Sequence, residues 1–335
     1  MPYEIWNRRY TGSKYKLADW IFEIIDSQCS GNSFCDIFAG TGIIAKHAVE
    51  RIPKVVVNDF LYSNEVVYKA FFMQSAFDKE KIEHYKDIFQ SLQVNKLKEN
   101  YISKNYGGKF FSMNDAIVIG EIRERIETIE DVNEKEKAIL IASLLYSVDK
   151  IANTVGHYDA YIKGHQIQDQ FKYDLISPYL TDSRVEIHRE DANNLAKTLN
   201  CDIVYIDPPY NSRQYSRFYH VLENLTTWKK PELYGVALKP KPENMSEYCR
   251  STALEAFTTL IKDLNCKYIL VSYNNTYTSK SSSSMNKMTL DNIQQVLSTK
   301  GKLKCFEKSH PYFNAGKTSF TDHKELLFMV EVNKL

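Results

Sequence analysis

The stretch Phe34-Cys35-Asp36-Ile37-Phe38-Ala39-Gly40-Thr41-Gly42 determines the fold, because an apolar run leads directly into a glycine-rich turn. Glycine permits the tight turn and lets backbone amides approach a ligand at the N-terminus of the next helix. Residues 43–51 have the pattern of a short helix, and the apolar run Val55–Val57 follows them. Residues 34–58 therefore predict a βαβ unit whose two strands are parallel.

Further β-rich apolar runs extend this sheet. We expect strands at Val185–His188, Ile203–Ile206, Tyr268–Ser272, Leu303–Glu307 and Glu325–Val332, and less clearly at Tyr68–Phe72. The sequence thus predicts an α/β fold with a Rossmann-like sheet of about seven strands. Residues 279–284, which are serine except for Lys280, predict a loop.

The region 61–182 has a different pattern, with helical periodicity in residues 114–131 and 134–151. It is far too long for a connection between two elements. We therefore expect a domain formed by residues 1–60 and 183–335, with residues 61–182 as a helical insertion.

Composition limits the class of protein. The six cysteines are scattered, and no two have C-x-x-C spacing, so neither zinc nor a redox pair is expected and a reduced, cytoplasmic location fits best. The sequence has no apolar stretch long enough to cross a membrane and no leader pattern at its start. With 43 Lys and Arg against 42 Asp and Glu, any nucleic-acid surface must be local. The histidines lack partners at metal-ligand spacing, and a monomer is the default expectation.

Two acidic positions accompany the glycine turn. Asp36 ends the first predicted strand beside Gly40 and Gly42, and Asp59 follows the second. In such folds a carboxylate at the end of the second strand binds ribose hydroxyls, which makes these residues candidates for cofactor binding. A purely structural turn, and an Asp59 that caps the following helix, are the alternatives.

The string Val204-Tyr205-Ile206-Asp207-Pro208-Pro209-Tyr210-Asn211 runs from an apolar strand into Asp-Pro-Pro-Tyr. The prolines prevent continuation of the strand and fix the backbone carbonyls. Asp207 and the Pro208 carbonyl can each accept one N–H bond of a base amine and aim its nitrogen at a sulfonium methyl group. Tyr210 offers a face on which an extruded base can stack. The sequence therefore predicts methylation of a base amine, with residues 207–210 as the catalytic loop.

Arginines alternate with aromatic residues in the segment that follows this loop. Arg213 and Arg217 are positioned to contact phosphates of a docked nucleic acid. The alternative is a basic helix that only faces solvent.

In their order along the chain, these motifs resemble those of the Dam-like adenine group of Asp-Pro-Pro-Tyr DNA amino-methyltransferases, and the resemblance covers most of the chain. Residues 9–14 look like the group's N-terminal motif, which contacts the methionine moiety of the cofactor, although Ser13 replaces a glycine often found there. Within it, Tyr10 stands where the family often has another aromatic and Lys14 matches the basic residue. Asp191 resembles the acid that meets the adenine ring of the cofactor, and a helix N-cap is its alternative.

The remaining matches follow the same order: Phe38, Gly40 and Gly42 for the cofactor loop, Asp59 for the ribose acid, and Asp207, Pro208, Pro209 and Tyr210 for the catalytic tetrapeptide. The resemblance implies a class I methyltransferase fold, S-adenosylmethionine as cofactor and double-stranded DNA as substrate. It also implies target recognition by region 61–182 and a restriction–modification role with a partner endonuclease. Methylation of an RNA base amine, and a non-catalytic nucleic-acid binder with a cofactor fold, are the alternatives.

Overall fold

The computed structural model describes residues 2–164, 166–275, 286–309 and 324–333, so the predicted loop at 279–284 lies outside the described residues. The chain divides into two compact units. The sheet unit contains residues 14–60, 182–214 and 244–335, and the helical unit contains residues 1–13, 61–181 and 215–243. The helical unit thus includes residues 1–13 and 215–243, which the boundaries expected from sequence assigned to the domain that holds the sheet.

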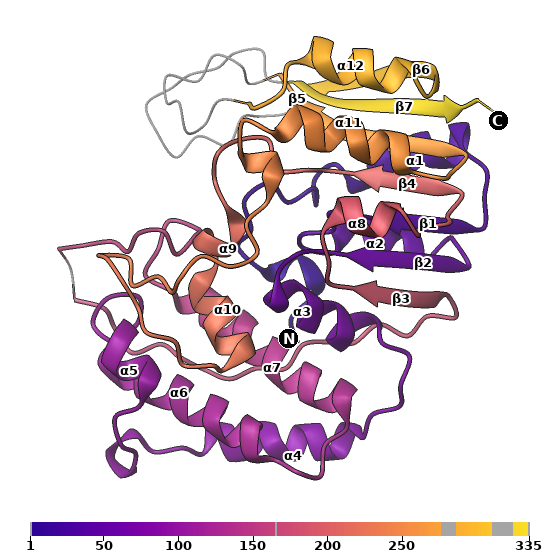
Figure 1. Cartoon of the computed structure of the whole chain (residues 1–335). Coiled ribbons are helices and arrows are strands. Elements are labelled where there is room, and N and C mark those ends of the chain that lie inside the picture. The colour runs from indigo at the N-terminus through magenta and orange to yellow at the C-terminus, as the bar shows by residue number, and fades with distance from the viewer. Residues whose placement is uncertain (1, 165, 276–285, 310–323, 334–335) are drawn as a thin grey trace. The chain divides into compact units, whose positions relative to one another are not determined.

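The sheet unit is built on one seven-stranded sheet within the described residues, with the order β3-β2-β1-β4-β5-β7-β6 (Figure 1). The strands are β1 Ser33–Asp36, β2 Lys54–Asn58, β3 Arg184–His188, β4 Ile203–Ile206, β5 Tyr268–Asn274, β6 Gly301–Ser309 and β7 Lys324–Val332. The first five in this order are parallel, whereas β7 is antiparallel to both β5 and β6. The α/β, Rossmann-like class is therefore confirmed. The strand order reverses between β1 and β4, where such sheets bind ligands beyond their carboxyl ends.

Helices cover both faces of this sheet. They are α1 Ala18–Gln28, α2 Ile43–Val49, α8 Ala192–Ala196, η3 Glu247–Cys249, α11 Ala253–Asp263 and α12 Leu290–Ser298. Cys35 of β1 joins the core that contains Leu195 of α8 and Phe257 of α11, and these helices lie in front of the sheet in Figure 1. The neighbouring Phe34 points to the opposite face, where its ring centroid lies 5.9 Å from that of Phe22 in α1. Both faces of β1 are buried, as a central parallel strand requires.

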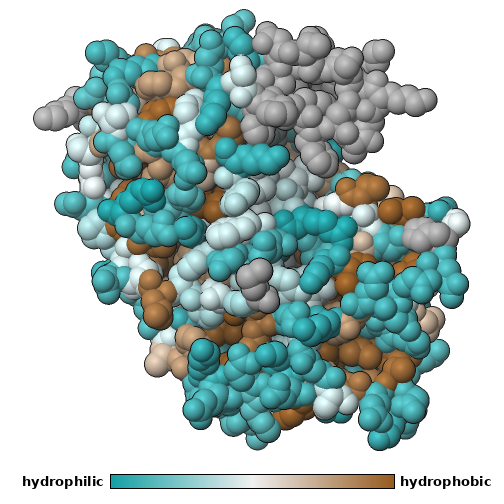
Figure 2. Space-filling view, turned by 180° about the vertical axis from the view of Figure 1, so that it is seen from behind, coloured by the Kyte–Doolittle hydropathy of each residue, from teal (hydrophilic) through white to brown (hydrophobic). Residues whose placement is uncertain are grey.

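The helical unit contains the remaining helices of the described residues. They are η1 Ile5–Asn7, α3 Tyr62–Phe72, α4 Lys79–Gln90, η2 Val94–Lys96, α5 Tyr101–Tyr106, α6 Met113–Thr128, α7 Glu134–Ile151, α9 Tyr215–Phe218 and α10 His220–Thr227. A reciprocal capping box starts α7: the Asn133 side chain accepts from the Glu136 amide at 3.0 Å, and the Glu136 carboxylate accepts from the Asn133 amide at 2.9 Å. In the described part of the chain, no helix is long and apolar enough to cross a membrane. On the face shown in Figure 2, hydrophobic residues form separate patches among hydrophilic ones.

The weak strand prediction at Tyr68–Phe72 is wrong, because these residues form the last part of α3. Tyr68, Ala70, Phe71 and Phe72 are all buried. A helix that is buried on several sides gives a continuous apolar run, which cannot be distinguished from a buried strand by periodicity alone.

Candidate active site

The glycine turn has the backbone geometry that its sequence predicts. Gly40 and Gly42 have φ angles of 53° and 80°, in the left-handed region that glycine adopts without steric cost. Gly42 is the N-cap residue of α2, and its amide donates to the Ala39 carbonyl at 2.7 Å. The backbone between β1 and α2 is therefore a tight turn at the carboxyl end of a central strand.

Asp59 is hydrogen-bonded to this turn. Its Oδ2 atom accepts a hydrogen bond from the Gly40 amide at 2.9 Å. The N-cap residue of the following helix is Leu61, so Asp59 does not cap that helix. The structure therefore connects the acidic end of β2 with the glycine turn after β1, both within the sheet unit.

Asn58, the residue immediately before Asp59, was not predicted from the sequence to belong to the site. The residue is 1% exposed, and its side-chain amide donates to the Ile37 carbonyl at 3.0 Å and to the Glu190 carbonyl at 3.1 Å. Its side-chain oxygen accepts from the Glu190 amide at 3.1 Å. Asn58 thus links the segments that follow β1 and β3, and a polar residue at the end of an apolar run was the only signal for it in the sequence.

Asp36 is a buried carboxylate at the end of β1, with 1% exposure. Among the described residues, neither of its carboxylate oxygens has a well-formed hydrogen bond. Burial raises the pKa of Asp36 well above its usual range, and Asp207 and Asp59 raise it further, against a smaller opposing effect of the Ala45 amide. A buried anion without a counter-charge is costly, so this position fits a cationic ligand.

Asp191 is the N-cap of α8. Its Oδ1 atom accepts from the Asn193 amide at 3.0 Å and from the Asn194 amide at 3.3 Å. The capping alternative is therefore what the structure shows, and any contact of Asp191 with a cofactor would have to coexist with this cap. The Tyr248 hydroxyl donates to the Asn193 side chain at 2.9 Å, and burial followed by the charge of Asp191 raises the pKa of Tyr248.

Phe38 packs edge-on against Tyr248, with ring centroids 5.0 Å apart and an interplanar angle of 78°. Two packed aromatic rings therefore lie beside the turn, and Tyr248 also contacts Asn193 near the start of α8. Tyr248 lies in η3, and no motif in the sequence marked it.

The catalytic loop predicted from sequence begins at the carboxyl end of β4. The Tyr210 hydroxyl donates to Asp207 Oδ1 at 2.5 Å. The Lys14 ammonium nitrogen lies 3.1 Å from the same oxygen, donates to the Tyr210 hydroxyl, and lies 3.9 Å from Glu325 Oε2. The side chain of Lys14 is 6% exposed and that of Asp207 15% exposed. One buried cation therefore connects Asp207 to a second carboxylate, that of Glu325, which was not predicted from the sequence.

The charges around Asp207 act in opposite directions. Burial raises the pKa of Asp207 above its usual value and Glu325 raises it further, whereas Lys14 and the Tyr210 hydrogen bond lower it. Burial alone would lower the pKa of Lys14, but Asp207 and Glu325 outweigh burial, and the net effect is a raised pKa. Lys14 therefore stays protonated, and Asp207 has its cationic partner in place.

The loop has further contacts besides this ion pair. The Tyr210 ring packs edge-on against Tyr273 at 5.1 Å and 82°, and the Tyr210 carbonyl accepts from the Lys287 amide at 2.7 Å. Pro208 is buried and Pro209 is half-buried. Rings and prolines together fix the direction of the loop's acceptors.

The other residues predicted from sequence divide between the units. Arg213 belongs to the sheet unit, whereas Tyr10 and Arg217 belong to the helical unit. The Arg217 Nη1 atom donates to the Pro240 carbonyl at 2.5 Å, and the Tyr10 ring stacks on Tyr219 with centroids 4.8 Å apart and a 6° interplanar angle. Arg217 and Tyr10 therefore have partners within the helical unit itself.

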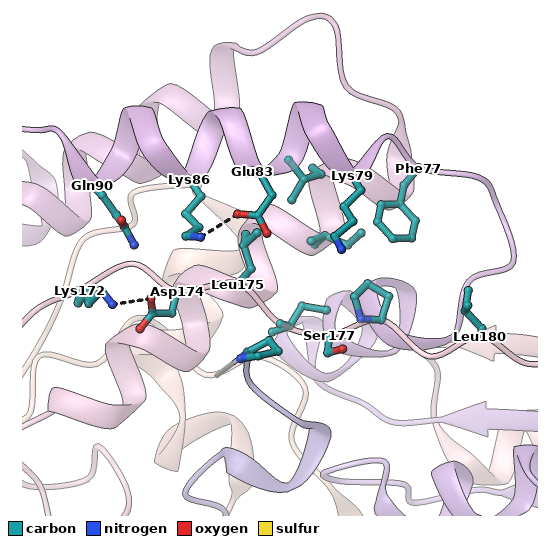
Figure 3. Close-up of a pocket in the computed structure, with 15 residues that line it drawn as sticks. Phe77, Lys79, Glu83, Lys86, Gln90, Lys172, Asp174, Leu175, Ser177 and Leu180 are labelled. Carbon is teal, nitrogen blue, oxygen red and sulfur yellow. Dashed lines mark hydrogen bonds and ion pairs between the residues drawn. The ribbon is translucent and has the colours of Figure 1, made fainter.

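A cavity of about 680 Å³ lies elsewhere, within the helical unit, between α4 and residues 172–180. Figure 3 shows Lys86 turned toward Glu83, 2.7 Å away, and Lys172 turned toward Asp174, 3.2 Å away. None of the site residues predicted from sequence is among the side chains that line it. We therefore do not assign this cavity to the reaction.

Comparison with known proteins agrees with the geometry of the sheet unit. Residues 10–285 match the model of the D12 class N6 adenine-specific DNA methyltransferase family. The type II methyltransferase M.NlaIII of Neisseria lactamica is 29% identical over 94% of this chain and 95% of its own length. The type II methyltransferase M.CviAII of Paramecium bursaria Chlorella virus 1 is 30% identical over 97% of this chain and 98% of its own length. M.FokI of Planomicrobium okeanokoites is 32% identical over 79% of this chain, which spans 44% of that longer protein.

The family match covers most of the chain and includes the turn after β1, Asp59 and the Asp-Pro-Pro-Tyr loop. The chain therefore belongs to the D12 class of N6 adenine-specific DNA methyltransferases and is an adenine-specific DNA methyltransferase.

Proposed function

We propose that Asp207 and the Pro208 carbonyl accept the two N–H bonds of an adenine amine extruded from double-stranded DNA, which then receives a methyl group from S-adenosylmethionine. The observation that carries this proposal is the orientation of the Asp207 carboxylate. Its contacts with Lys14 and Tyr210 both use Oδ1, and Oδ2 takes part in neither. In this arrangement the protein holds the carboxylate through Oδ1, and Oδ2 is the oxygen that accepts from the substrate amine.

The chemistry follows from the weakness of the nucleophile. The lone pair of the adenine amine is delocalised into the ring, and two fixed acceptors favour a pyramidal nitrogen whose lone pair is localised. As the nitrogen bonds to the methyl carbon, the bond between that carbon and the sulfonium sulfur breaks, and its electron pair stays on the sulfur. The nitrogen carries a positive charge until it releases one of its protons to solvent, and the nearby Asp207 carboxylate stabilises that charge. Tyr210 offers its ring for stacking of the extruded base.

The acidic side chains of the sheet unit favour a cationic cofactor. Four buried or half-buried carboxylates, Asp36, Asp59, Asp207 and Glu325, interact directly or through electrostatic effects at this edge of the sheet. When bound, S-adenosylmethionine would supply a sulfonium methyl group, and Asp36, whose carboxylate oxygens lack well-formed hydrogen bonds among the described residues, would hold its ammonium group.

The other cofactor contacts in this proposal are those expected from sequence. Asp59 binds the ribose hydroxyls, Asp191 meets the adenine ring of the cofactor, Lys14 contacts the methionine moiety, and the amides of the glycine turn approach the ligand. Tyr10, Phe38, Gly40 and Gly42 complete the set.

The proposal extends to the biological setting. M.NlaIII and M.CviAII bear the names of type II methyltransferases, and we propose a restriction–modification role for this chain, paired with an endonuclease. Arg213 and Arg217 contact DNA phosphates, and the helical unit recognises the target sequence. The enzyme acts as a monomer in the cytoplasm.

The substitution Asp207→Asn tests the role of the carboxylate with almost no change in shape. We expect methyl transfer to DNA to fall by about 100-fold or more, the usual effect of losing one preorganised electrostatic group, with cofactor affinity retained. Asp263→Asn at the end of α11, away from the catalytic loop in sequence, is the control. Transfer at the wild-type rate by Asp207→Asn would remove the catalytic assignment.

A further inference from the structure

A second carboxylate, from the reversed strand of the sheet, reaches the lysine that is paired with Asp207. β4 and β5 are parallel neighbours, so they end at the same edge. β7 is antiparallel to β5, and its register pairs Glu325 with Asn274, the last residue of β5. β7 therefore begins at the edge where β4 leads into Asp207, and Glu325 is one of its first residues.

Glu325 is buried at this edge, with 8% exposure. Its Oε2 atom lies 3.9 Å from the Lys14 ammonium, which lies 3.1 Å from Asp207 Oδ1. The cation is thus shared by two carboxylates. Because Lys14 is 6% exposed, solvent screens neither attraction strongly.

Sharing the cation changes the charge that a substrate meets. Lys14 and Asp207 alone would sum to zero, whereas the three groups together carry one negative charge. An amine that becomes positive during methyl transfer is stabilised by a net negative charge in a buried site. A lysine held by Asp207 alone would instead compete with the amine for the carboxylate.

We propose that Glu325 is a positioning residue for methyl transfer, which shares Lys14 with Asp207 and thereby leaves the Asp207 carboxylate available to the target amine. The inference rests on the proposed function of Asp207. Glu325 acts through Lys14 and is not itself a catalytic residue.

The pH dependence of transfer separates this role from a structural one. The titratable groups that act on or respond to Asp207 are Lys14, Tyr210, Glu325, Asp36 of β1 and Tyr205 of β4. Among these, Glu325 raises the pKa of Asp207, whereas Lys14 lowers it. Loss of the Glu325 charge therefore moves the acid limb of the rate profile to lower pH, and loss of the Lys14 charge moves it to higher pH.

The experiment compares Glu325→Gln with the wild type and with Glu331→Gln, an exposed glutamate of the same strand. Single-turnover methylation of DNA is measured against pH with saturating S-adenosylmethionine, and cofactor binding is measured by calorimetry. We expect Glu325→Gln to be roughly tenfold slower at neutral pH, with its acid limb at lower pH and cofactor affinity little changed. The Glu331→Gln variant should match the wild type.

A double-mutant cycle with Lys14→Met tests whether Glu325 acts through the lysine. On the pH-independent part of the profile, the slowing caused by Glu325→Gln should largely disappear in the Lys14→Met background, because residues of one network are not additive. If Glu325→Gln alone folds poorly, Lys14→Met is compared directly with the double variant, which has lost both charges of the pair, and equal plateau rates are expected.

A wild-type rate and profile for Glu325→Gln would overturn the inference. It would also be overturned if Glu325→Gln slowed transfer equally in the wild-type and Lys14→Met backgrounds. A slower Glu325→Gln whose acid limb does not move, and whose cofactor affinity and stability fall in parallel, would overturn it as well. These outcomes differ from a failure of the proposed function, in which wild-type enzyme would not methylate adenine or Asp207→Asn would remain active.

Discussion

The substitution Lys14→Met removes the buried cation while it keeps a side chain of similar length. Lys14 Nζ lies 3.1 Å from Asp207 Oδ1 and 3.9 Å from Glu325 Oε2. At an effective dielectric constant of about 20, the nearer contact alone corresponds to a gross attraction of about 5 kcal/mol. Desolvation and relaxation cancel part of this value. Measured losses on removing one partner of a buried pair are about 3–5 kcal/mol, and we expect the free energy of unfolding to fall by about that amount.

The sign of the effect on activity follows from the carboxylate. Burial already raises the pKa of Asp207, and Lys14 opposes that rise. Without the lysine the pKa rises further, so Asp207 becomes protonated at a higher pH and can no longer accept from the amine. The acid limb of single-turnover methylation by Lys14→Met should therefore lie at higher pH than that of the wild type.

The assay is a pH–rate profile with saturating cofactor and DNA, accompanied by urea unfolding. Lys16→Met, at an exposed lysine nearby in sequence, is the matched control and should behave as the wild type. An acid limb that stays at the wild-type pH in Lys14→Met would refute the role of Lys14 in lowering the pKa of Asp207. Unchanged stability would show that the cation contributes little to the fold.

Three further predictions concern other parts of the chain. Asp59→Ala should weaken cofactor binding in calorimetry by about tenfold or more, because a charge-assisted hydrogen bond to the ribose is lost, and unchanged affinity would contradict the ribose assignment. Replacing Arg213 and Arg217 together by glutamine should lower DNA affinity and reduce its salt slope by about 2, which a filter-binding titration measures. Burial lowers the pKa of His220 to about 4, below its ordinary 6.5, so it is neutral when folded and the unfolded chain takes up the proton first as pH falls. The free energy of unfolding should therefore decrease by roughly 3 kcal/mol as the pH falls from 6.5 to about 4. In urea unfolding, His220→Gln should reduce this pH dependence, and an equal slope in both proteins would contradict the prediction.

The local part of the site could be predicted from sequence because it depends on residues that are close along the chain. The run from Phe34 to Gly42 specifies a strand and a turn, and the prolines after Asp207 specify where β4 ends. Parallel strands end at one edge of a sheet, so these motifs could be expected to converge before the structure was known.

The missed residues depend on long-range packing. Glu325 reaches Lys14 only because β7 runs in the reverse direction, and its register cannot be read from a strand pattern. Asn58 links two segments whose separation in sequence is large, and Tyr248 lies in a short helix without a motif.

The division into units depends on long-range contacts as well. Residues 1–13 and 215–243 pack with the helical unit, yet nothing in their composition separates them from the neighbouring motifs. For Tyr68–Phe72, the buried side chains of a helix had the same apolar pattern as a buried strand.

The most direct test of the central claim is to identify the methylated nucleoside. Wild-type enzyme and Asp207→Asn are incubated with methyl-labelled S-adenosylmethionine and, in separate reactions, with unmethylated genomic DNA and with total RNA. The products are then digested to nucleosides and separated. We predict label in N6-methyldeoxyadenosine with the wild-type enzyme, and little or none with Asp207→Asn. Label in an RNA nucleoside alone, in a different DNA base, or at equal levels with both proteins would contradict the account.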